Sequence, residues 1–433
     1  MKFSIYLAIW GKEYIYDFME QILPLHFSPG NLLAFSENNC SVEFVFYTLL
    51  DDVERFSHYS SYRKLKNLMP VSVKGVKTRH TDKFYIMTEL HNLAVLDAEN
   101  KDSTMIFFFA DVVFSEGYFS RLIELRNEGY RAVLGFALLT NKDEFIQSYH
   151  LSSGRKFVQQ ALSCVHDEVR THDWDDSLVS EAPNSITFPL HENRGLLIRS
   201  FHWTPIMLAP IEKGIQSYWT IDVDLVRRTC LDYRCIYIVT DSDDMAIASL
   251  SKKDDYRQKQ ILTKGATLEV FAQWSLLGAD PFHLKFFQEK LWFLFEQKNP
   301  SLTATEEISD KVVKDIFLLR KSISNVFEDI VTLSQGRDII IFGAGGYGQL
   351  VSRTLIHYDC HTAAFFDNDP NKWGMKYGPV QVKKPDFSNS NNCFFIITAE
   401  RYNEIVVGLK KYGLVENNDF FIFKSKHINK FKG

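Results

Sequence analysis

The sequence contains few cysteines and no long apolar run. Its six cysteines are scattered over 433 residues and form no Cys-x-x-Cys pair, which argues against a disulfide framework or a zinc knuckle and is typical of a reducing compartment. No window reaches the roughly 18 uninterrupted apolar residues that a membrane-spanning helix needs. The first residues, MKFSIYLAIWGKEY, lack a long apolar core and a small-residue cleavage site, so they predict a first strand instead of a signal peptide. We therefore expect a cytoplasmic protein.

Basic blocks are also absent from most of the chain. The formal net charge is −5, and without a long run of lysine and arginine we expect no nucleic-acid partner. The exception is the C-terminal tail, FKSKHINKFKG, in which basic residues are interleaved with phenylalanine and isoleucine. Such a tail is either a solvated terminus or a peripheral contact with the inner membrane. The sequence leaves the oligomeric state open.

The apolar content is large enough for more than one core. Hydrophobic residues make up 45% of the chain, which has 36 phenylalanines. A length of 433 residues exceeds that of an ordinary domain and suggests two or three. We expect a first domain at 1–250, a helical connector at 251–335 and a second domain at 336–433.

Apolar runs and helical periodicities alternate through the first 140 residues. Five apolar runs predict strands, at 3–9, 42–49, 71–76, 105–109 and 131–139. Apolar residues at helical spacing predict helices, at 12–25, 83–100 and 116–128. This order predicts an α/β fold with a mostly parallel sheet. Between residues 252 and 330 the sequence predicts mostly helix.

One of these strands delivers an acid to its carboxyl end. In IFFFADVVFSEGYFSRL, residues 106–122, an apolar run precedes Asp111, and a Ser-x-Gly turn and an amphipathic segment follow. Ligands of open α/β sheets bind outside the carboxyl ends of strands. The structural alternative is that Asp111 caps the helix that follows.

This segment resembles the metal-binding segment of GT-A-fold glycosyltransferases, which use a nucleotide-diphosphate-sugar donor. In that family an Asp-x-Asp pair holds Mg²⁺ or Mn²⁺, and the resemblance implies this role for Asp111. The chain departs from the pattern at the first acid, where Phe109 stands. YTLLDD at 47–52 likewise resembles the second-strand acids that meet the uracil or ribose. This implies donor binding by Asp51 and Asp52, with a polar strand end as the alternative.

Further acids and a histidine arrive between residues 195 and 244. His202 and Trp203 lie between two apolar runs, and the candidate catalytic acids are Asp222, Asp224, Asp241 and Asp243. In GT-A enzymes such late residues supply a metal ligand, the base that takes the acceptor proton, or sugar contacts. The resemblance therefore implies that His202 is a metal ligand and that catalysis uses one of these acids. The alternatives are a hydrogen-bonded core histidine, a core tryptophan and solvated acids.

The two-residue spacing of Asp222 and Asp224 is compatible with either an extended segment or a helix. In an extended segment Asp222 and Asp224 would share one face. On a helix their side chains would diverge by roughly 200°. The sequence also predicts that residues 222–228 can open a helix.

Residues 1–250 thus resemble a divergent GT-A glycosyltransferase of the kind that builds bacterial surface polysaccharides. The resemblance rests on the layout of the segments and on the partly degraded metal motif around Asp111. It implies a nucleotide-diphosphate-sugar donor, a divalent cation (Mn or Mg), and a glycan or lipid-linked acceptor. Such an enzyme would work in the cytoplasm, either free or peripherally at the inner membrane.

A glycine turn follows an apolar run near residue 340. Gly343-x-Gly345-x-x-Gly348 opens a helix-like segment, and Asp367 ends a second apolar run in FFDNDPNKWG. This is the order of a dinucleotide-type fold, in which the glycines admit a phosphate and the acid binds ribose. The alternative for the glycines is tight packing of a strand and a helix without a ligand.

Residues 336–433 resemble the Rossmann-like, nucleotide-sugar-binding domain of bacterial sugar acyltransferases, through FGAGGYGQ, FFDNDPNKWG, ITAERYNEI and GLVENNDFFIF. The resemblance implies nucleotide binding by the three glycines and Asp367. Two other functions stay open. This domain could be the cofactor site of an NAD-dependent oxidoreductase or another nucleotide-sugar-modifying enzyme, or the chain could be a non-catalytic nucleotide-sugar-binding scaffold.

Overall fold

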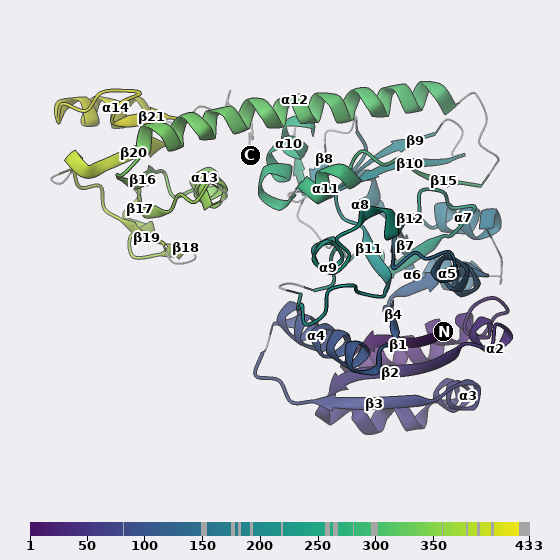
Figure 1. Cartoon of the computed structure of the whole chain (residues 1–433). Helices are drawn as coiled ribbons and strands as arrows, with labels where there is room; N and C mark the ends of the chain where they lie inside the picture. The colour runs from purple at the N-terminus through teal and green to yellow at the C-terminus, as the bar shows by residue number, and fades with distance from the viewer. Residues whose placement is uncertain are drawn as a thin grey trace. The chain divides into compact units, whose positions relative to one another are not determined.

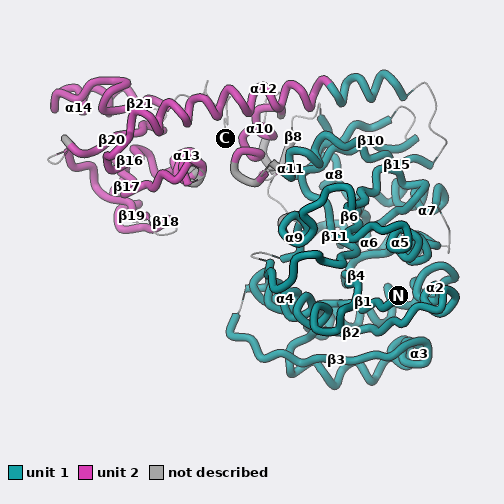
Figure 2. Tube along the Cα trace, in the orientation of Figure 1, with its two compact units in different colours: residues 1–176, 184–259, 281–310 teal, residues 177–183, 260–280, 311–433 magenta. Residues whose placement is uncertain are grey.

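The computed structural model divides into two compact units (Figure 2). Unit 1 contains residues 1–176, 184–259 and 281–310, and unit 2 contains residues 177–183, 260–280 and 311–433. The structure describes residues 1–80, 82–148, 154–174, 178–180, 183–190, 194–217, 220–255, 260–262, 267–279, 281–295, 302–356, 358–377, 380–387, 390–399 and 402–423. Both units combine helices with a central sheet, which confirms the mixed α/β class that the sequence predicted.

A seven-stranded sheet forms the centre of unit 1. Its strands, in order, are β12 (Ile236–Ile238), β6 (Ala132–Gly135), β11 (Thr204–Leu208), β4 (Thr104–Phe108), β1 (Lys2–Ala8), β2 (Ser41–Leu49) and β3 (Val71–Val76) (Figure 1). All neighbours are parallel except β11, which runs antiparallel to both β4 and β6. The five strands predicted in the first 140 residues are present, and the last of them is divided into β6 and β7 (Ala137–Asn141).

Helices cover this sheet. The longest helix on it, α4 (Lys83–Lys101), packs on β1, β2 and β4. It begins where Asp82 accepts a hydrogen bond from the N–H of Phe84, and it ends at Asp102, whose φ is 48°. Other helices of the unit are α1 (Lys12–Asp17), α2 (Ala34–Glu37), α3 (Ser60–Leu68), α5 (Tyr118–Asn127), α6 (Lys142–Ser148), α7 (Gly154–Ser163), α8 (Asp167–Arg170) and α9 (Val223–Thr229).

Two small sheets extend unit 1. One consists of β5 (Val112–Phe114), β13 (Ile247–Ser251) and β7, and the other consists of β15 (Leu291–Leu294), β10 (Gly195–Ser200) and β9 (Ser185–Pro189). β15 lies in the stretch that the sequence predicted to be mostly helical. The prediction is wrong at this point because LWFL, a run of four buried apolar residues, pairs antiparallel with β10.

The rest of that stretch is largely helical. Its helices are α10 (Thr267–Gly278), α11 (Pro281–Phe286) and α12 (Thr303–Ser334). The first turns of α12 belong to unit 1, where Arg199 on β10 donates hydrogen bonds to Ser309 Oγ at 2.7 Å and to the carboxylate of Asp310. Arg199 is only 1% exposed, and a buried charge needs such partners because leaving it unpaired costs several kcal/mol.

A six-stranded sheet forms the centre of unit 2. Its order is β18 (Lys376–Tyr377), β19 (Val380–Lys383), β17 (Thr362–Phe366), β16 (Asp338–Phe342), β20 (Cys393–Ile397) and β21 (Phe420–Ile422). Every pair is parallel except β18 with β19. α13 (Gly346–Ile356) follows β16 and α14 (Tyr402–Lys411) follows β20, so this is the Rossmann-like alternation that the sequence predicted. β8 (Leu178–Ser180) and β14 (Gln260–Leu262) pair antiparallel in the same unit.

Packing requires two of the three glycines in the turn after β16. Gly343 has a φ of +113°, and a Cβ there would lie 2.8 Å from Thr398 Oγ1. At Gly348 a Cβ would lie only 1.9 Å from the carbonyl oxygen of Gly343. A Cβ at Gly345 would meet no described atom within 4 Å. The close approach of the strand end to the helix therefore depends on Gly343 and Gly348.

The glycine turn yields a prediction for stability. Gly348→Ala should destabilise unit 2 by at least about 2 kcal/mol, because the new methyl group would overlap a backbone carbonyl that cannot move away cheaply. Gly345→Ala is the matched control and should stay within about 0.5 kcal/mol of the parent. Hydrogen exchange of unit 2 peptides in the full chain measures both. Equal protection in the two variants would contradict the packing described here.

A buried histidine connects the first helical segment to the strand after β4. His26 is fully buried and packs against the rings of Phe108 and Phe114, with ring centroids 4.8 and 5.6 Å away. Its Nε2 accepts a hydrogen bond from the N–H of Phe114, so the proton is on Nδ1, which donates to the carbonyl of Ile22. Burial lowers the pKa of His26 to about 4, because a charged ring would lose hydration and the bond to Phe114.

This histidine makes the stability of unit 1 depend on pH. The unfolded chain takes up a proton at His26 near pH 6.5, whereas the folded chain does so only at its lowered pKa of about 4. The free energy of unfolding should therefore fall as pH decreases through this interval. His26→Gln should show a shallower fall in urea unfolding at several pH values, whereas the exposed His58→Gln should keep the parental slope. An unchanged slope in His26→Gln would refute the assignment. The free energy of unfolding of His26→Gln should still fall somewhat as pH decreases, because burial also lowers the pKa of His91 to about 4.

Candidate functional site

A cavity of about 440 Å³ lies at one edge of the main sheet of unit 1. Its lining includes Phe109 and Asp111, which follow β4, and Phe136, which follows β6. It also includes His202, which precedes β11. Because β11 is antiparallel to β4, the beginning of β11 and the end of β4 lie at the same edge. The cavity is thus at the carboxyl ends of the parallel strands, where open α/β sheets bind ligands.

The walls of the cavity combine apolar and titratable side chains. α4 contributes Phe84 and His91, and the region of α8 contributes Glu168 and His172. Among the described lining residues there is no lysine or arginine. The charge-bearing groups are therefore carboxylates and imidazoles, which suit a cation better than a bare anion.

Asp111 lies between β4 and β5 and lines the cavity. Its Oδ2 accepts a hydrogen bond from Ser249 Oγ at 3.2 Å, and its carbonyl oxygen accepts one from the N–H of Leu250 at 2.7 Å. The next helix, α5, begins only at Tyr118. Asp111 therefore does not cap a helix, and the structural alternative that the sequence left open is wrong.

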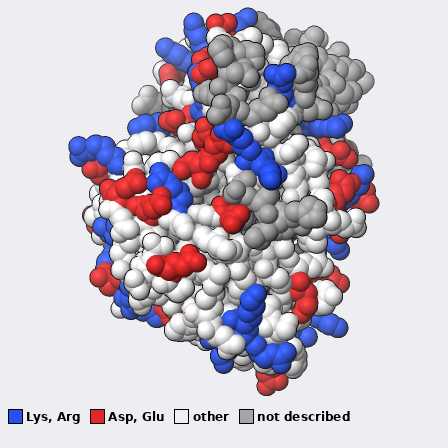
Figure 3. Space-filling view, turned by 90° about the vertical axis from the view of Figure 1, so that its right-hand side faces the viewer, with Lys and Arg blue, Asp and Glu red and all other residues white. Residues whose placement is uncertain are grey.

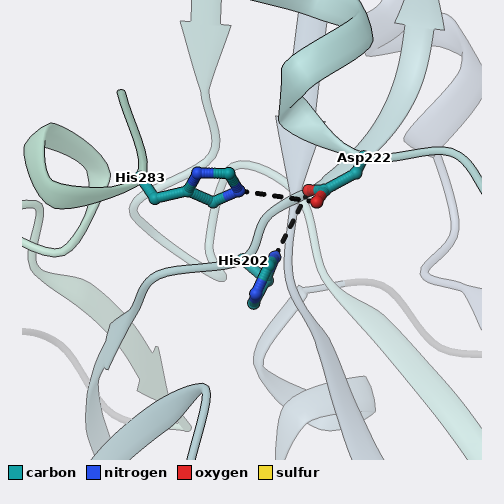
Figure 4. Close-up of side chains that lie close together, drawn as sticks. All are labelled: His202, Asp222 and His283. Atoms are coloured by element: carbon teal, nitrogen blue, oxygen red, sulfur yellow. Dashed lines mark hydrogen bonds and ion pairs between the residues drawn. The ribbon is translucent and has the colours of Figure 1, made fainter. Parts of the chain in front are cut away.

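Three side chains from distant parts of unit 1 converge on one point (Figure 4). His202 Nδ1 lies 3.3 Å from Asp222 Oδ1, and His283 Nε2 lies 3.4 Å from Asp222 Oδ2. The two imidazole rings are 4.8 Å apart between centroids and inclined by 68°. The three ligand atoms all lie within 4.8 Å of one another, which makes this group a candidate metal site.

The members of this triad come from different elements. His202 lies between β10 and β11, Asp222 immediately precedes α9, and His283 lies in α11. The side chains of His202 and Asp222 are about one-third exposed, whereas that of His283 is 7% exposed. Sequence reasoning missed His283, because a single histidine in an apolar helix carries no local signal. His91 was missed for the same reason, and Glu168 was missed because it is one of several charged residues in a polar stretch.

The electrostatics of the triad favour an ionised aspartate. Burial by itself disfavours the charged form of Asp222 and would raise its pKa. Hydrogen bonds and electrostatic attraction from His202 and His283 outweigh this effect and hold the pKa of Asp222 well below its usual range. Asp222 is therefore a carboxylate that two imidazoles contact.

The other predicted acids of this region are placed elsewhere. α9 begins at Val223, so Asp222 and Asp224 do not form an extended pair, and the side chain of Asp224 lies outside the described part of the structure. Asp241 Oδ1 accepts a hydrogen bond from the N–H of Asp243 at 2.9 Å. Asp243 forms an exposed ion pair with Arg155 at 2.8 Å. None of these side chains is among the described lining of the cavity.

Asp51, Asp52 and Trp203 also lie away from the described cavity lining. Asp52 is buried and accepts hydrogen bonds from the N–H of Gly11 at 2.8 Å and from Arg55 Nε at 2.6 Å, so it ties the end of β1 to the segment after β2. Asp51 is exposed. Trp203 is 1% exposed and donates to the carbonyl of Ser200 at 3.1 Å, which is the core role that the sequence left open for it.

In unit 2, the carboxylate of Asp367 is engaged by the chain itself. Its Oδ2 accepts hydrogen bonds from the N–H of Ala344 and from Lys372 Nζ, both at 2.9 Å, and its Oδ1 accepts one from the N–H of Asp369 at 2.9 Å. Burial would raise the pKa of Asp367, but these donors outweigh it and lower the pKa. Asp367 therefore holds the glycine turn through Ala344.

Charges of both signs are mixed on the protein surface. On the face drawn in Figure 3, lysine and arginine side chains are interspersed with aspartate and glutamate. Elsewhere in the described chain, side chains of opposite charge form ion pairs, such as Arg121 with Asp244 at 2.9 Å. The visible described part of that face presents no broad basic surface of the kind that follows a phosphate backbone. In the described part of the chain, no helix is both long and apolar enough to span a membrane.

Comparison with known proteins adds little to this geometry. No protein-family model matches the chain, and no curated protein matches it. A solved structure that resembles it is described as a glucose-1-phosphate thymidylyltransferase of Bacillus anthracis in complex with sucrose. The match covers 33% of this chain and 57% of that protein, at 13% sequence identity and a TM-score of 0.20. The chain thus aligns with little more than half the length of that protein, and a likeness of this size carries no argument about the site.

Proposed function

We propose that unit 1 is a metal-dependent glycosyltransferase that binds a nucleotide-diphosphate sugar in the cavity at the carboxyl edge of its main sheet. The observation that carries the proposal is the meeting of Asp111 and His202 in one cavity, although 90 residues separate them in the chain. The resemblance to GT-A enzymes had assigned both to the metal. The acceptor would be a glycan or a lipid-linked glycan.

The size and walls of the cavity are compatible with such a donor. A volume of about 440 Å³ lies within the roughly 300–1,000 Å³ that small-molecule sites occupy. Aromatic side chains of Phe84, Phe109 and Phe136 line it, and such rings can contact a base or a sugar. Phe109 takes the place of the first acid of the family motif, so at this position the wall offers apolar contact instead of a second carboxylate.

The charge of the cavity supports a requirement for a cation. A diphosphate brings negative charge, yet the described lining contains the carboxylates of Asp111 and Glu168 and no lysine or arginine. The carboxylate of Asp111, with the hydroxyl of Ser249 beside it, provides the oxygen ligands that Mg²⁺ and Mn²⁺ prefer. When bound, such a cation would neutralise the diphosphate as it leaves.

The transfer also needs a group that accepts a proton. The bond between the anomeric carbon and the diphosphate oxygen breaks, the acceptor oxygen bonds to that carbon, and the acceptor hydroxyl gives up its proton. Besides Asp111, Glu168 is the carboxylate among the described lining residues. It is 4% exposed and held in α8. We assign proton acceptance to Glu168 and cation binding to Asp111.

Donor binding tests the role of Asp111. With Mn²⁺ and a UDP-sugar at about 100 times its dissociation constant, the parent should be stabilised by roughly 2.7 kcal/mol. Asp111→Asn should lose the Mn²⁺-dependent part of this effect in thermal-shift measurements. Asp243→Asn, which removes an acid from a surface ion pair, should keep it. A full Mn²⁺-dependent shift in Asp111→Asn, or no shift in the parent with any UDP- or GDP-sugar, would contradict the proposal.

Turnover tests the role of Glu168. Glu168→Gln should lower the rate of sugar transfer or donor hydrolysis by about 10²–10⁴-fold, because the neutral amide cannot take the proton. The metal-dependent thermal shift should persist, since the side chain keeps its size. Glu144→Gln, on α6, is the control. An unchanged rate in Glu168→Gln would show that another group accepts the proton.

A further inference from the structure

The group formed by His202, Asp222 and His283 does not include Asp111, although His202 and Asp111 line the same cavity. Among the described residues, these two histidines and Asp222 form the group of at least three His, Cys, Asp or Glu side chains whose ligand atoms all lie within 4.8 Å of one another. The triad therefore offers three ligand atoms for an ion without any contribution from Asp111. We infer that His202, Asp222 and His283 form a resident metal centre that takes a nitrogen-preferring divalent ion of the zinc class, without any nucleotide.

The spacing of the triad suits a single ion. Two ligand atoms about 2.1 Å from a tetrahedral ion are separated by about 3.4 Å. His202 Nδ1 lies 3.3 Å from Asp222 Oδ1, His283 Nε2 lies 3.4 Å from Asp222 Oδ2, and no separation among the three ligand atoms exceeds 4.8 Å. Without an ion, the same atoms share hydrogen bonds. In Figure 4 both imidazole rings point at the carboxylate of Asp222, which is the arrangement that either hydrogen bonding or a shared ion requires. Each of these imidazole nitrogens would bind the ion through its lone pair, so an ion here would replace any proton shared with Asp222.

The donor set selects the class of ion. Two imidazole nitrogens and one carboxylate oxygen suit zinc, cobalt and similar ions. Mg²⁺ and Ca²⁺ prefer oxygen ligands and bind imidazole weakly by comparison. Three protein ligands are also the number found in catalytic zinc centres, where water or a substrate supplies the fourth. His202 lines the cavity, so an ion at this centre would lie at the cavity wall.

The ligands are held by ordered elements. Asp222 is fixed at the start of α9, where its carbonyl accepts a hydrogen bond from the N–H of Leu225 at 3.1 Å. His283 lies in α11, which packs on α9. The carbonyl of His202 accepts a hydrogen bond from Ser200 Oγ at 2.6 Å. Ligands carried on packed helices and a bonded turn are preorganised for an ion.

Cobalt uptake by the full-length chain tests the centre. After treatment with a chelator, the parent should bind Co²⁺ in the absence of nucleotide and show the visible absorption of a low-coordinate cobalt centre, which Zn²⁺ should displace. His283→Asn and Asp222→Asn should each weaken binding by more than about 100-fold, since even outer partners of a metal ligand can matter by 10–100-fold. The exposed His58→Asn is the control and should bind as the parent does.

Two results would overturn the metal centre itself, and a third would overturn the assigned class of ion. One is the absence of Co²⁺ and Zn²⁺ uptake by the parent; the other is uptake that survives the loss of His283 or Asp222. Because His283 is buried and its replacement could unfold the unit, circular dichroism should accompany each variant, and the partly exposed His202→Asn provides a third test of the same centre. Tighter binding of Mg²⁺ than of Zn²⁺ would also reject the assigned class of ion.

The metal centre and the proposed glycosyltransferase function can be tested separately. Asp111→Asn should leave nucleotide-free Co²⁺ uptake unchanged, because Asp111 is not a member of the triad. Uptake without any response to sugar nucleotides would support the metal centre and reject the glycosyltransferase. A Mn²⁺-dependent response to the sugar nucleotide without Co²⁺ uptake would support the glycosyltransferase and reject the metal centre.

Discussion

The reversed direction of β11 is the constraint on which the candidate site depends. β11 lies between β4 and β6 and is antiparallel to both. If it ran parallel to them, its beginning would lie at the opposite edge of the sheet, and His202 would be far from Asp111. Because it is reversed, the turn before β11 opens at the edge where β4 ends. α9 packs on β11, and α11 packs on α9, so the same reversal also brings Asp222 and His283 to His202.

The strands of unit 1 could be predicted from sequence because buried strands of a parallel sheet are nearly continuous apolar runs. The run from 105 to 109 and the observed β4 at Thr104–Phe108 illustrate this. β15 could not be predicted in the same way. Its four apolar residues lie within a stretch rich in helical patterns, and only pairing with β10, almost 100 residues earlier, makes them a strand. The order of strands depends on such distant pairings, so local pattern alone does not establish it.

In the candidate site, too, local sequence pattern identified single residues but not the contacts between residues that are distant in the chain. The pattern singled out Asp111 and His202 because each adjoins an apolar run, and Asp222 because it opens the Asp-x-Asp at 222–224. It could not show that Asp111 and His202 share a cavity, or that Asp222 contacts His202. The pattern at 222–224 left an extended pair and a helix open, and the start of α9 at Val223 decides for the helix. His283 had no signal at all, because its significance comes only from its two partners in space.

Unit 2 presents the opposite case, in which the motif is clear but much of it is explained without a ligand. Gly343 and Gly348 are needed because a side chain would collide with Thr398 or with the turn itself. Asp367, which would bind ribose in a dinucleotide site, already accepts hydrogen bonds from Ala344 and Lys372. A ribose would therefore have to replace Lys372 or share the carboxylate with it. Gly345 differs from the other two glycines, because a Cβ there would meet no described atom within 4 Å. Packing gives no reason for glycine at this position, so the case for a phosphate at the turn depends on Gly345 more than on the rest of the motif.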